Sequence, residues 1–265
     1  MTEDDAALAE RLLGSRLEIR GRLASASNLT CLVSLEGGGA AVYKPVSGTR
    51  PLHDFDTSTL AAREVAAYLL SEAGGWHVVP VTVLREGPLG PGSVQWWVDT
   101  EGPPGEGLVE VASAEEVPEG WLPVLRGEDE LGTPVVVAHA DRPDLAGVAV
   151  LDVLLNNADR KAAHLLLDPA DRLWACDHGL CLHEHDKLRT VLWGWHGRPV
   201  PAQDLQRLRR VRAALAAGEP LRRDLEELVG AEEVRALTGR VTGLLARPVM
   251  PDPPAGRYPL PWPIW

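Results

Sequence analysis

The sequence predicts an α+β protein of two lobes, with an antiparallel, β-rich N-terminal lobe that carries one helix and a mainly α-helical C-terminal lobe. Apolar and polar residues alternate with period two in short stretches near the start of the chain, as in strands with one buried face. Helical spacing of apolar residues prevails in the second half, and a segment rich in Gly, Pro and Glu separates the two parts. With 265 residues, the chain can bury a sizeable core without disulfides.

The N-terminal lobe is expected to span residues 1–98. A short helix over residues 6–13 comes first. Five stretches then have the composition of strands: residues 17–23, 29–35, 40–45, 78–85 and 93–99. A helix is predicted over residues 60–70, because Asp56 and Ser58 can cap its start and the two glycines at 74–75 stop it.

The C-terminal part is divided by composition into three further segments. Residues 99–120 are expected to form a linker or exposed insertion, residues 121–247 the C-terminal lobe, and residues 248–265 a Pro- and Trp-rich tail packed across the body. Within the lobe, helical patterning begins at Asp144 and ends at the paired asparagines 156 and 157. A short hairpin should follow around the turn at 168–171, and two or three amphipathic helices should occupy about 203–246.

Charge and cysteine content exclude several classes of protein. The formal net charge of −12 disfavours a nucleic-acid or anionic-membrane binder, because both need clustered Lys and Arg. The acidic N-terminus lacks the basic and apolar regions of a secretion signal, and no stretch offers about 18 uninterrupted apolar residues for a membrane span. Three cysteines in a chain of this length suit a reducing compartment, so a cytoplasmic location is expected.

Two loop aspartates form the most informative arrangement. Asp159 follows the helix that ends at residue 157, and Asp177 stands 18 positions further on, after the predicted hairpin and before His-Gly. A hairpin returns the chain beside its starting point, so the two carboxylates should lie close together. Phosphoryl transfer to a hydroxyl needs one carboxylate to accept the proton of the nucleophile and another to hold magnesium on the nucleotide phosphates. Each aspartate alone could equally be a turn residue.

These residues resemble a known family. The string N-A-D-R-K-A-A-H at 157–164 resembles the D-R-H-x-x-N catalytic loop of phosphoinositide 3- and 4-kinases and HipA-type kinases, and D-H-G at 177–179 resembles their D-F-G. The likeness covers about residues 17–190 in order, and the whole is similar to an actinobacterial kinase-like family. It implies a bilobal protein-kinase-like fold that binds ATP with Mg²⁺ or Mn²⁺, with Asp159 as catalytic base and Asp177 as metal ligand.

Two positions depart from the family pattern. Lys161 stands where these families have His, and His164 stands where they have a second metal-binding Asn. Imidazole is a poorer magnesium ligand than an oxygen donor. His164 therefore binds the metal weakly, or Asn156 or Asn157 substitutes for it, or the site favours manganese, or the protein binds nucleotide without catalysis.

Lys44 and Glu64 are expected to form an ion pair. Lys44 is one of three lysines among 26 basic residues, and it ends a predicted strand as the family's phosphate-contacting lysine does. Glu64 has apolar neighbours three and four positions away on its helix. A carboxylate in an apolar stripe needs a cationic partner, and the resemblance implies that Lys44 is that partner. The alternative is that Glu64 lies partly exposed at the edge of the stripe.

The nucleotide-covering residues are predicted mainly from the resemblance. The hydroxyl and amide residues of the first hairpin are placed to cover phosphates, and a strand before the linker is placed to receive adenine through its backbone. These candidates are Ser25, Ser27 and Asn28 for the phosphates, and Gln95, Trp96 and Trp97 for the base.

The preferred hypothesis is a metal-dependent phosphotransferase that acts on a hydroxyl of a small molecule or protein. The segment after Asp177 lacks the basic cluster that a phosphoinositide headgroup requires, which disfavours a lipid kinase. Two alternatives remain, a catalytically weak nucleotide-binding protein and a nucleotidyl (AMP) transferase. Structural zinc on the Cys- and His-rich run at 176–185 is a further alternative, although paired C-x-x-C spacing is absent.

Overall fold

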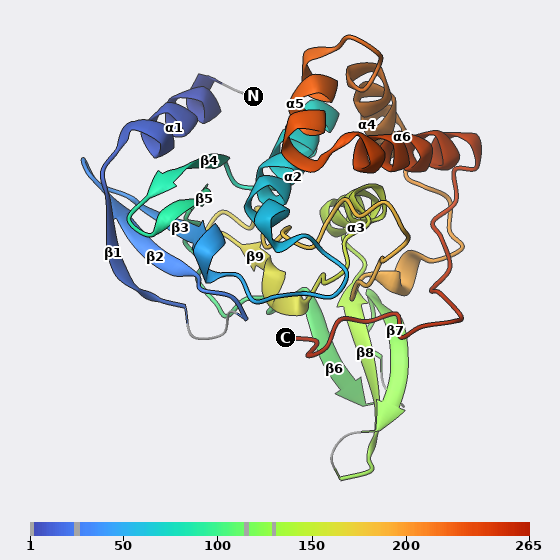
Figure 1. Ribbon diagram of the computed structural model, residues 1–265. Helices are drawn as coiled ribbons and strands as arrows, with labels where there is room; N and C mark the ends of the chain where they lie inside the picture. The colour runs from blue at the N-terminus through green and yellow to red at the C-terminus, as the bar shows by residue number, and fades with distance from the viewer. Residues whose placement is uncertain (1–2, 24–26, 114–116, 129–130) are drawn as a thin grey trace.

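The structure is a computed structural model that describes residues 3–23, 27–113, 117–128 and 131–265. Figure 1 shows an N-terminal lobe built on a twisted sheet and a C-terminal lobe made mainly of helices, with helix α2 (Leu60–Gly74) between them. This confirms the α+β class and the division into a β-rich first half and a helical second half.

Five antiparallel strands form the N-terminal sheet in the order β1-β2-β3-β5-β4. Helix α1 (Glu3–Gly14) packs beside β4 and β5. The strands are β1 (Leu17–Arg22), β2 (Cys31–Leu35), β3 (Ala40–Pro45), β4 (Thr82–Gly87) and β5 (Gly90–Trp96).

The pleat of β3 decides where Lys44 points. Alternate residues of this strand, Ala41, Tyr43 and Pro45, are buried, and the residues between them face the other side of the sheet. Lys44 lies on that second face, opposite Ser93 of β5 in the strand register. The strand therefore directs the lysine side chain out of the lobe's own core.

Helix α2 is buried on nearly all sides. The carboxylate of Asp56 accepts a hydrogen bond from the Ser58 amide (2.9 Å) just before the helix, and Gly75, with φ of 82°, ends it in the left-handed conformation that glycine adopts without strain. The helix packs against β4 and β5 on one side and against α4 (Ala202–Ala214) and α5 (Pro220–Val229) on the other. Even Arg63 and Glu64 are buried, so each needs a polar partner inside the protein.

The C-terminal lobe is organised around α3 (Pro143–Leu155), a helix that is apolar almost all round and lies at its centre. Asn156, with φ of 53°, ends α3. The short hairpin of β9 (Leu165–Leu167) and β10 (Leu173–Ala175) follows, as predicted. Helix α6 (Ala231–Ala246) packs against α3, α4 and α5.

A three-stranded sheet has its first strand within residues 99–120, for which a linker or exposed insertion was expected, and its other two strands at the start of the predicted C-terminal lobe. It has the order β6-β8-β7 and projects away from the rest of the protein in Figure 1. Its strands are β6 (Val109–Ser113), β7 (Trp121–Glu128) and β8 (Pro134–Ala140). Gly, Pro and Glu dominate the segment before β6, so its composition resembles that of a loop. The valines of β6 pair with residues more than 20 positions away, and local composition does not reveal such pairing. The exact limits of the lobes stay a prediction.

Buried His139 fastens this sheet to the C-terminal lobe. Its Nε2 accepts a hydrogen bond from the Gly194 amide (3.0 Å), and its ring packs against Trp195 with centroids 4.2 Å apart. Burial lowers the pKa of His139 to about 4, so the ring is neutral and its Nδ1 donates to the Ala140 carbonyl (3.0 Å).

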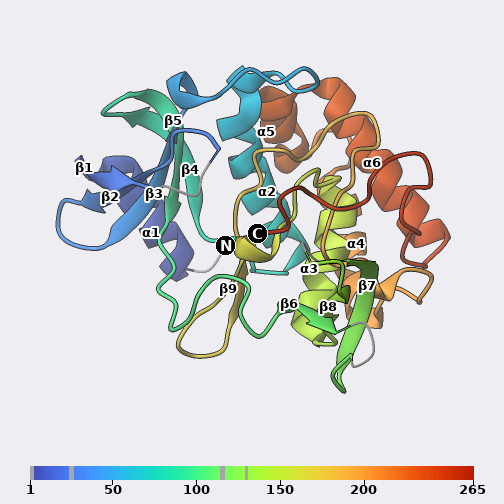
Figure 2. The same cartoon turned by 90° about the horizontal axis from the view of Figure 1, so that it is seen from below.

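The C-terminal tail crosses the body of the protein, as the sequence suggested. The carbonyl of Pro259 accepts hydrogen bonds from the Thr190 amide (3.3 Å) and from Trp193 Nε1 (3.0 Å), and Leu260 is 1% exposed. The carbonyl of Ile264 accepts from the Ala162 amide (2.9 Å), and the chain ends close to β9 in both Figure 1 and Figure 2. Within the described part of the chain, every helix is too short or too polar to span a bilayer.

Candidate active site

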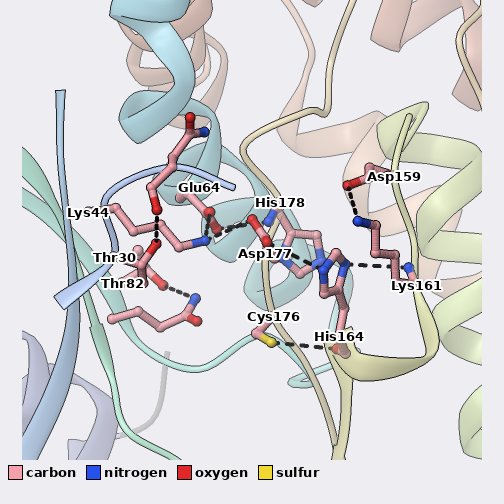
Figure 3. Close-up of polar contacts among 12 residues, drawn as sticks. Thr30, Lys44, Glu64, Thr82, Asp159, Lys161, His164, Cys176, Asp177 and His178 are labelled. Atoms are coloured by element: carbon pink, nitrogen blue, oxygen red, sulfur yellow. Dashed lines mark hydrogen bonds and ion pairs between the residues drawn. The ribbon is translucent and has the colours of Figure 1, made fainter. Parts of the chain in front are cut away.

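Lys44, Glu64 and Asp177 meet between the two lobes (Figure 3). The Lys44 ammonium donates a short hydrogen bond to Glu64 Oε1 and a second one to Asp177 Oδ1 at 2.8 Å. The other oxygen of Glu64 accepts from the backbone amide of His178 at 2.9 Å. The strand, the helix and the segment after β10 are thus joined through three side chains, and the predicted pairing of Lys44 with Glu64 is present.

The charges of this cluster support one another. Burial opposes the charge of Lys44, but Asp177 and Glu64 outweigh it and raise the lysine pKa well above its ordinary value. Packing around Asp177 likewise disfavours its charge, yet Lys44 and His164 hold the pKa of Asp177 well below its usual range. Burial raises the pKa of Glu64 in spite of the neighbouring lysine. Lys44 and Asp177 are therefore both ionised at neutral pH.

Asp177 combines exposure with an unusual backbone conformation. Its side chain is 49% exposed, in contrast to the 3% of Glu64, so one face of the carboxylate can reach a ligand. Its φ of 58° lies in the left-handed region, which non-glycine residues adopt infrequently and which is enriched at functional sites.

Asp159 lies in the loop after α3 and is held by its neighbours. Its backbone amide donates to Asn157 Oδ1 (3.0 Å), and Asn157 Nδ2 donates in turn to the buried carboxylate of Asp152 (3.0 Å). Lys161 Nζ lies 3.6 Å from Asp159 Oδ2. Burial raises the pKa of Asp159 to about 6, against the opposing effect of Lys161. A carboxylate with this pKa is suited to accept a proton near neutral pH.

His164 lies beside Asp177, with its Nε2 3.4 Å from Asp177 Oδ2. Burial lowers the pKa of His164 to about 4, so the imidazole is neutral. Its Nδ1 accepts a long hydrogen bond from the Lys161 amide (3.4 Å), which leaves the proton on Nε2, directed toward Asp177. Asn157 faces Asp152 instead, and Asn156 donates to the carbonyls of His183 and His185, so neither asparagine side chain is directed at Asp177.

The available ligands suit a metal that is only partly held by protein. Asp177 would contribute carboxylate oxygens and His164 a ring nitrogen, and magnesium commonly completes such a shell with phosphate oxygens and water. Among the described residues, no three His, Cys, Asp or Glu side chains converge as a metal site. The zinc alternative on residues 176–185 therefore finds no ligand set there.

Arg160 forms a buried network that the sequence analysis did not identify. Its guanidinium, 0% exposed, pairs with the Asp152 carboxylate at 3.0 Å and donates to the Cys176 carbonyl (2.8 Å). Its Nη2 also lies 2.7 Å from His178 Nε2, and arginine must be the donor in this hydrogen bond because a guanidinium has no acceptor. Burial holds the pKa of His178 well below its ordinary value. Arg160 thus ties the loop of Asp159 to the segment of Asp177. The available signal was Asp152, a carboxylate among apolar residues in the second half of α3, which needs a cationic partner by the reasoning that singled out Glu64.

Two of the three predicted phosphate-covering residues, Ser27 and Asn28, lie in the described part of the chain. Ser25 lies outside the described residues, and Ser27 is exposed. Asn28 fastens the first hairpin to the segment after β3, because its Oδ1 accepts from the Arg50 amide (2.9 Å). A phosphate-binding role for Ser25, Ser27 and Asn28 stays a prediction.

The side chains of the predicted adenine-binding strand have partners within the protein. Gln95 Nε2 donates to Thr82 Oγ1 (2.8 Å), Trp96 packs under Arg11 at 5.5 Å, and Trp97 Nε1 donates to Asp99 (3.1 Å). The amides of Trp96 and Trp97 donate to the carbonyls of Val81 and Ala40. An adenine contact from this strand would therefore use its carbonyls or the chain just after it, and it stays a prediction.

The sheet order, the strand lysine paired with a helix glutamate, and the two loop aspartates define a protein-kinase-like fold. Solved structures agree with this class at the level of the fold. The chain is similar to the Golgi casein kinase with Mn/ADP bound, with a TM-score of 0.57 and 14% identity over 92% of this chain and 76% of that one. It is also similar to the Helicobacter pylori proinflammatory kinase CtkA, with a TM-score of 0.51 and 10% identity over 90% of this chain and 94% of that one.

A sequence relative places the chain in a family. The chain is 46% identical to protein Rv2133c of Mycobacterium tuberculosis over 264 residues, which cover 96% of this chain and 94% of the relative. The chain belongs to the same family as that protein. No protein-family model matches the sequence. The finer placement in the phosphoinositide 3- and 4-kinase or HipA-type branch stays a prediction.

Proposed function

We propose that this protein is an ATP-dependent, divalent-metal-dependent phosphotransferase that acts on a hydroxyl group. The observation that carries the proposal is the Lys44 ammonium, which contacts the carboxylates of both Glu64 and Asp177 across the two lobes. A lysine fixed by a helix glutamate and adjacent to a metal-binding aspartate is the arrangement that protein kinases use to hold nucleotide phosphates. The Golgi casein kinase, which shares the fold, was solved with Mn and ADP.

Each residue has a definite task in this reaction. Lys44 would leave Asp177 to contact the phosphates of ATP, while its bond to Glu64 keeps the lysine side chain in place. Asp177 and His164 would hold Mg²⁺ or Mn²⁺, which neutralises the negative charge of the phosphates when bound. Asp159 would orient the acceptor hydroxyl and take its proton as the new P–O bond forms and the bond to ADP breaks.

His164 supports a second candidate function, nucleotide binding with little turnover. Its Nε2 proton is directed at Asp177, so a metal ligand at this position requires loss or rearrangement of that proton. Such a protein would bind ATP and act as a sensor or scaffold. Nucleotidyl transfer, with AMP as the transferred group, is the remaining alternative on the same fold.

Turnover with ATP separates these functions. The purified protein is incubated with ATP and Mg²⁺ or Mn²⁺ and a panel of hydroxyl compounds and seryl peptides, and the products are followed by ³¹P NMR and intact mass. Phosphorylated product with ADP supports the proposal, AMP attached to an acceptor supports nucleotidyl transfer, and unchanged ATP supports the binding protein. Asp159→Asn should lower the rate of product formation by roughly 10²–10⁴-fold.

The matched control is Asp171→Asn. Asp171 lies in the turn of the β9–β10 hairpin, is 72% exposed and has φ of 59°, which asparagine also adopts readily. The substitution removes one exposed carboxylate from the hairpin that follows the Asp159 loop, where Asp171 pairs with Arg142 (3.1 Å). An equal loss of product in Asp171→Asn and Asp159→Asn would contradict the assignment of Asp159 as the base.

A further inference from the structure

Arg63, the residue before Glu64, is buried, and its side chain bonds to residues outside the cluster of Lys44, Glu64 and Asp177. Its side chain is 3% exposed, although arginine is almost never fully buried unless it is paired. Successive residues of a helix point about 100° apart, which follows from 3.6 residues per turn. Thus Glu64 reaches toward Lys44 while Arg63 is directed elsewhere, into the C-terminal lobe.

The guanidinium of Arg63 connects α2 to two elements of that lobe. Its Nη1 donates to the Cys181 carbonyl at 2.7 Å, four residues after Asp177, and its Nη2 pairs with Glu233 of α6 at 3.2 Å. Its Nε donates to Thr59 at 3.0 Å, so all three nitrogens are occupied. The planar fork of arginine fixes these directions together, which a lysine at the same place could not do.

Residues just before α2 make a second set of contacts with the same segment. The Asp54 carbonyl accepts from His183 Nε2 at 2.7 Å, and its carboxylate pairs with Lys187 at 2.8 Å. The ring of Phe55 lies edge-on to His183 with centroids 5.0 Å apart, and the Arg63 guanidinium lies over the same Phe55 ring at 5.3 Å. The start of α2 and the segment after Asp177 are therefore one packed unit.

This segment offers no accessible hydroxyl for phosphorylation. Thr190 is the sole Ser, Thr or Tyr between residues 177 and 191. Thr190 is 2% exposed, donates to Asp152 at 3.1 Å and accepts from the Leu192 amide at 3.1 Å. Many kinases order the corresponding segment when a phosphate group pairs with an arginine. Here Arg63 binds a backbone carbonyl of the segment directly.

We infer that Arg63 is a positioning residue: it holds the segment after Asp177 against α2 and thereby keeps Lys44, Glu64 and Asp177 together without a phosphate group on that segment. The contact with Cys181 fixes the segment behind Asp177, and the helix transmits the same constraint to Glu64, which holds the His178 amide. The catalytic consequence rests on the proposed function, whereas the packing of the segment against α2 can be measured in the protein without nucleotide. The two can therefore be tested separately.

The test compares Arg63→Met with Arg207→Met. Methionine keeps the buried stem and loses the donors. Arg207 of α4 also links α2 to the C-terminal lobe, because its Nε donates to the Gly75 carbonyl (3.2 Å) at the end of α2 remote from the site, while its Nη1 pairs with Asp204 on its own helix (2.9 Å). Amide hydrogen exchange of residues 177–188 is measured in the free proteins at a temperature where all are folded. Arg63→Met should exchange at least tenfold faster at the His178 amide, and Arg207→Met should not.

A second readout connects this assembly to the site. Arg63→Met should lose at least half of the stabilisation by ATP and metal, relative to its own ligand-free melting temperature, while Arg207→Met keeps it. If Arg63→Met does not fold, Arg63→Lys retains the charge opposite Glu233 and should still accelerate exchange at His178. Unchanged exchange at His178 in a folded Arg63 variant overturns the inference. A wild-type protein that ATP does not stabilise overturns the proposed function instead, and the exchange result still decides the role of Arg63.

Discussion

Removal of the Lys44 ammonium tests whether the cluster between the lobes is the electrostatic centre of the protein. In Lys44→Met, Glu64 stays buried at 3% exposure with no cation, and Asp177 lies close to it. Removing one partner of a buried ion pair costs about 3–5 kcal/mol. For a protein of this size, about 2–4 °C per kcal/mol converts this into a melting temperature lower by roughly 6–20 °C.

The chain provides a matched control in Lys187. Lys187 and Lys44 have nearly the same side-chain exposure, 22% and 23%, and each pairs with an aspartate at 2.8 Å. The partner of Lys187, Asp54, is 46% exposed, and no buried glutamate depends on this lysine. An exposed pair contributes less than about 1 kcal/mol. Lys187→Met should therefore lower the melting temperature by less than about 4 °C.

The effect of Lys44→Met should also depend on pH with a definite sign. Burial raises the pKa of Glu64 already in the presence of the lysine, and loss of the lysine removes the opposing influence. The folded state then binds a proton more tightly than the unfolded state, so its stability falls as pH rises through the folded pKa. Melting curves by differential scanning fluorimetry should show a larger deficit at about pH 8 than at about pH 5. Equal deficits in the two lysine variants, or a deficit that grows toward low pH, would refute this reasoning.

Three further outcomes follow from the site. Asp159→Asn should lower turnover by roughly 10²–10⁴-fold with ATP binding unchanged, and wild-type turnover should decrease as pH falls through about 6, because burial raises the pKa of Asp159 to about that value and the base must be ionised. Normal turnover in Asp159→Asn excludes it as the base. His164→Asn should increase the ratio of activity with Mg²⁺ to activity with Mn²⁺, since an amide oxygen replaces a ring nitrogen beside Asp177. An unchanged ratio would show that His164 is not a metal ligand.

Local patterns in the sequence were sufficient for the elements that hold the ion cluster. The alternation through residues 40–45 predicted a strand with Lys44 near its end, and the apolar neighbours of Glu64 predicted a buried carboxylate that needs a cation. Both features are in the structure. The turn residues between Asp159 and Asp177 likewise predicted the β9–β10 hairpin. In each case the determining residues lie within a few positions of one another.

Features that depend on distant parts of the chain could not be predicted in this way. Strand β6 pairs with β8 across more than 20 positions, so composition alone suggested a linker for residues 99–120. Arg160 and Arg63 are surrounded by ordinary helix and loop residues, and their partners, His178 and Cys181, become visible only in three dimensions. The strand of Gln95 was predicted from alternation, and the bond of its side chain to Thr82 is compatible with an adenine contact through the backbone, which stays a prediction.

The central claim is that Asp177 holds a metal-bound ATP beside Lys44. Thermal-shift titration with ATP, with and without Mg²⁺ or Mn²⁺, on wild type and Asp177→Asn tests it most directly. Asp177→Asn keeps the shape of the side chain and removes the charge that Lys44 and His164 favour. The wild-type melting temperature should rise with ATP only when metal is present, and that of Asp177→Asn should show no metal-dependent rise. Absence of any stabilisation of the wild type by ATP, or an equal rise in both proteins, would contradict the claim.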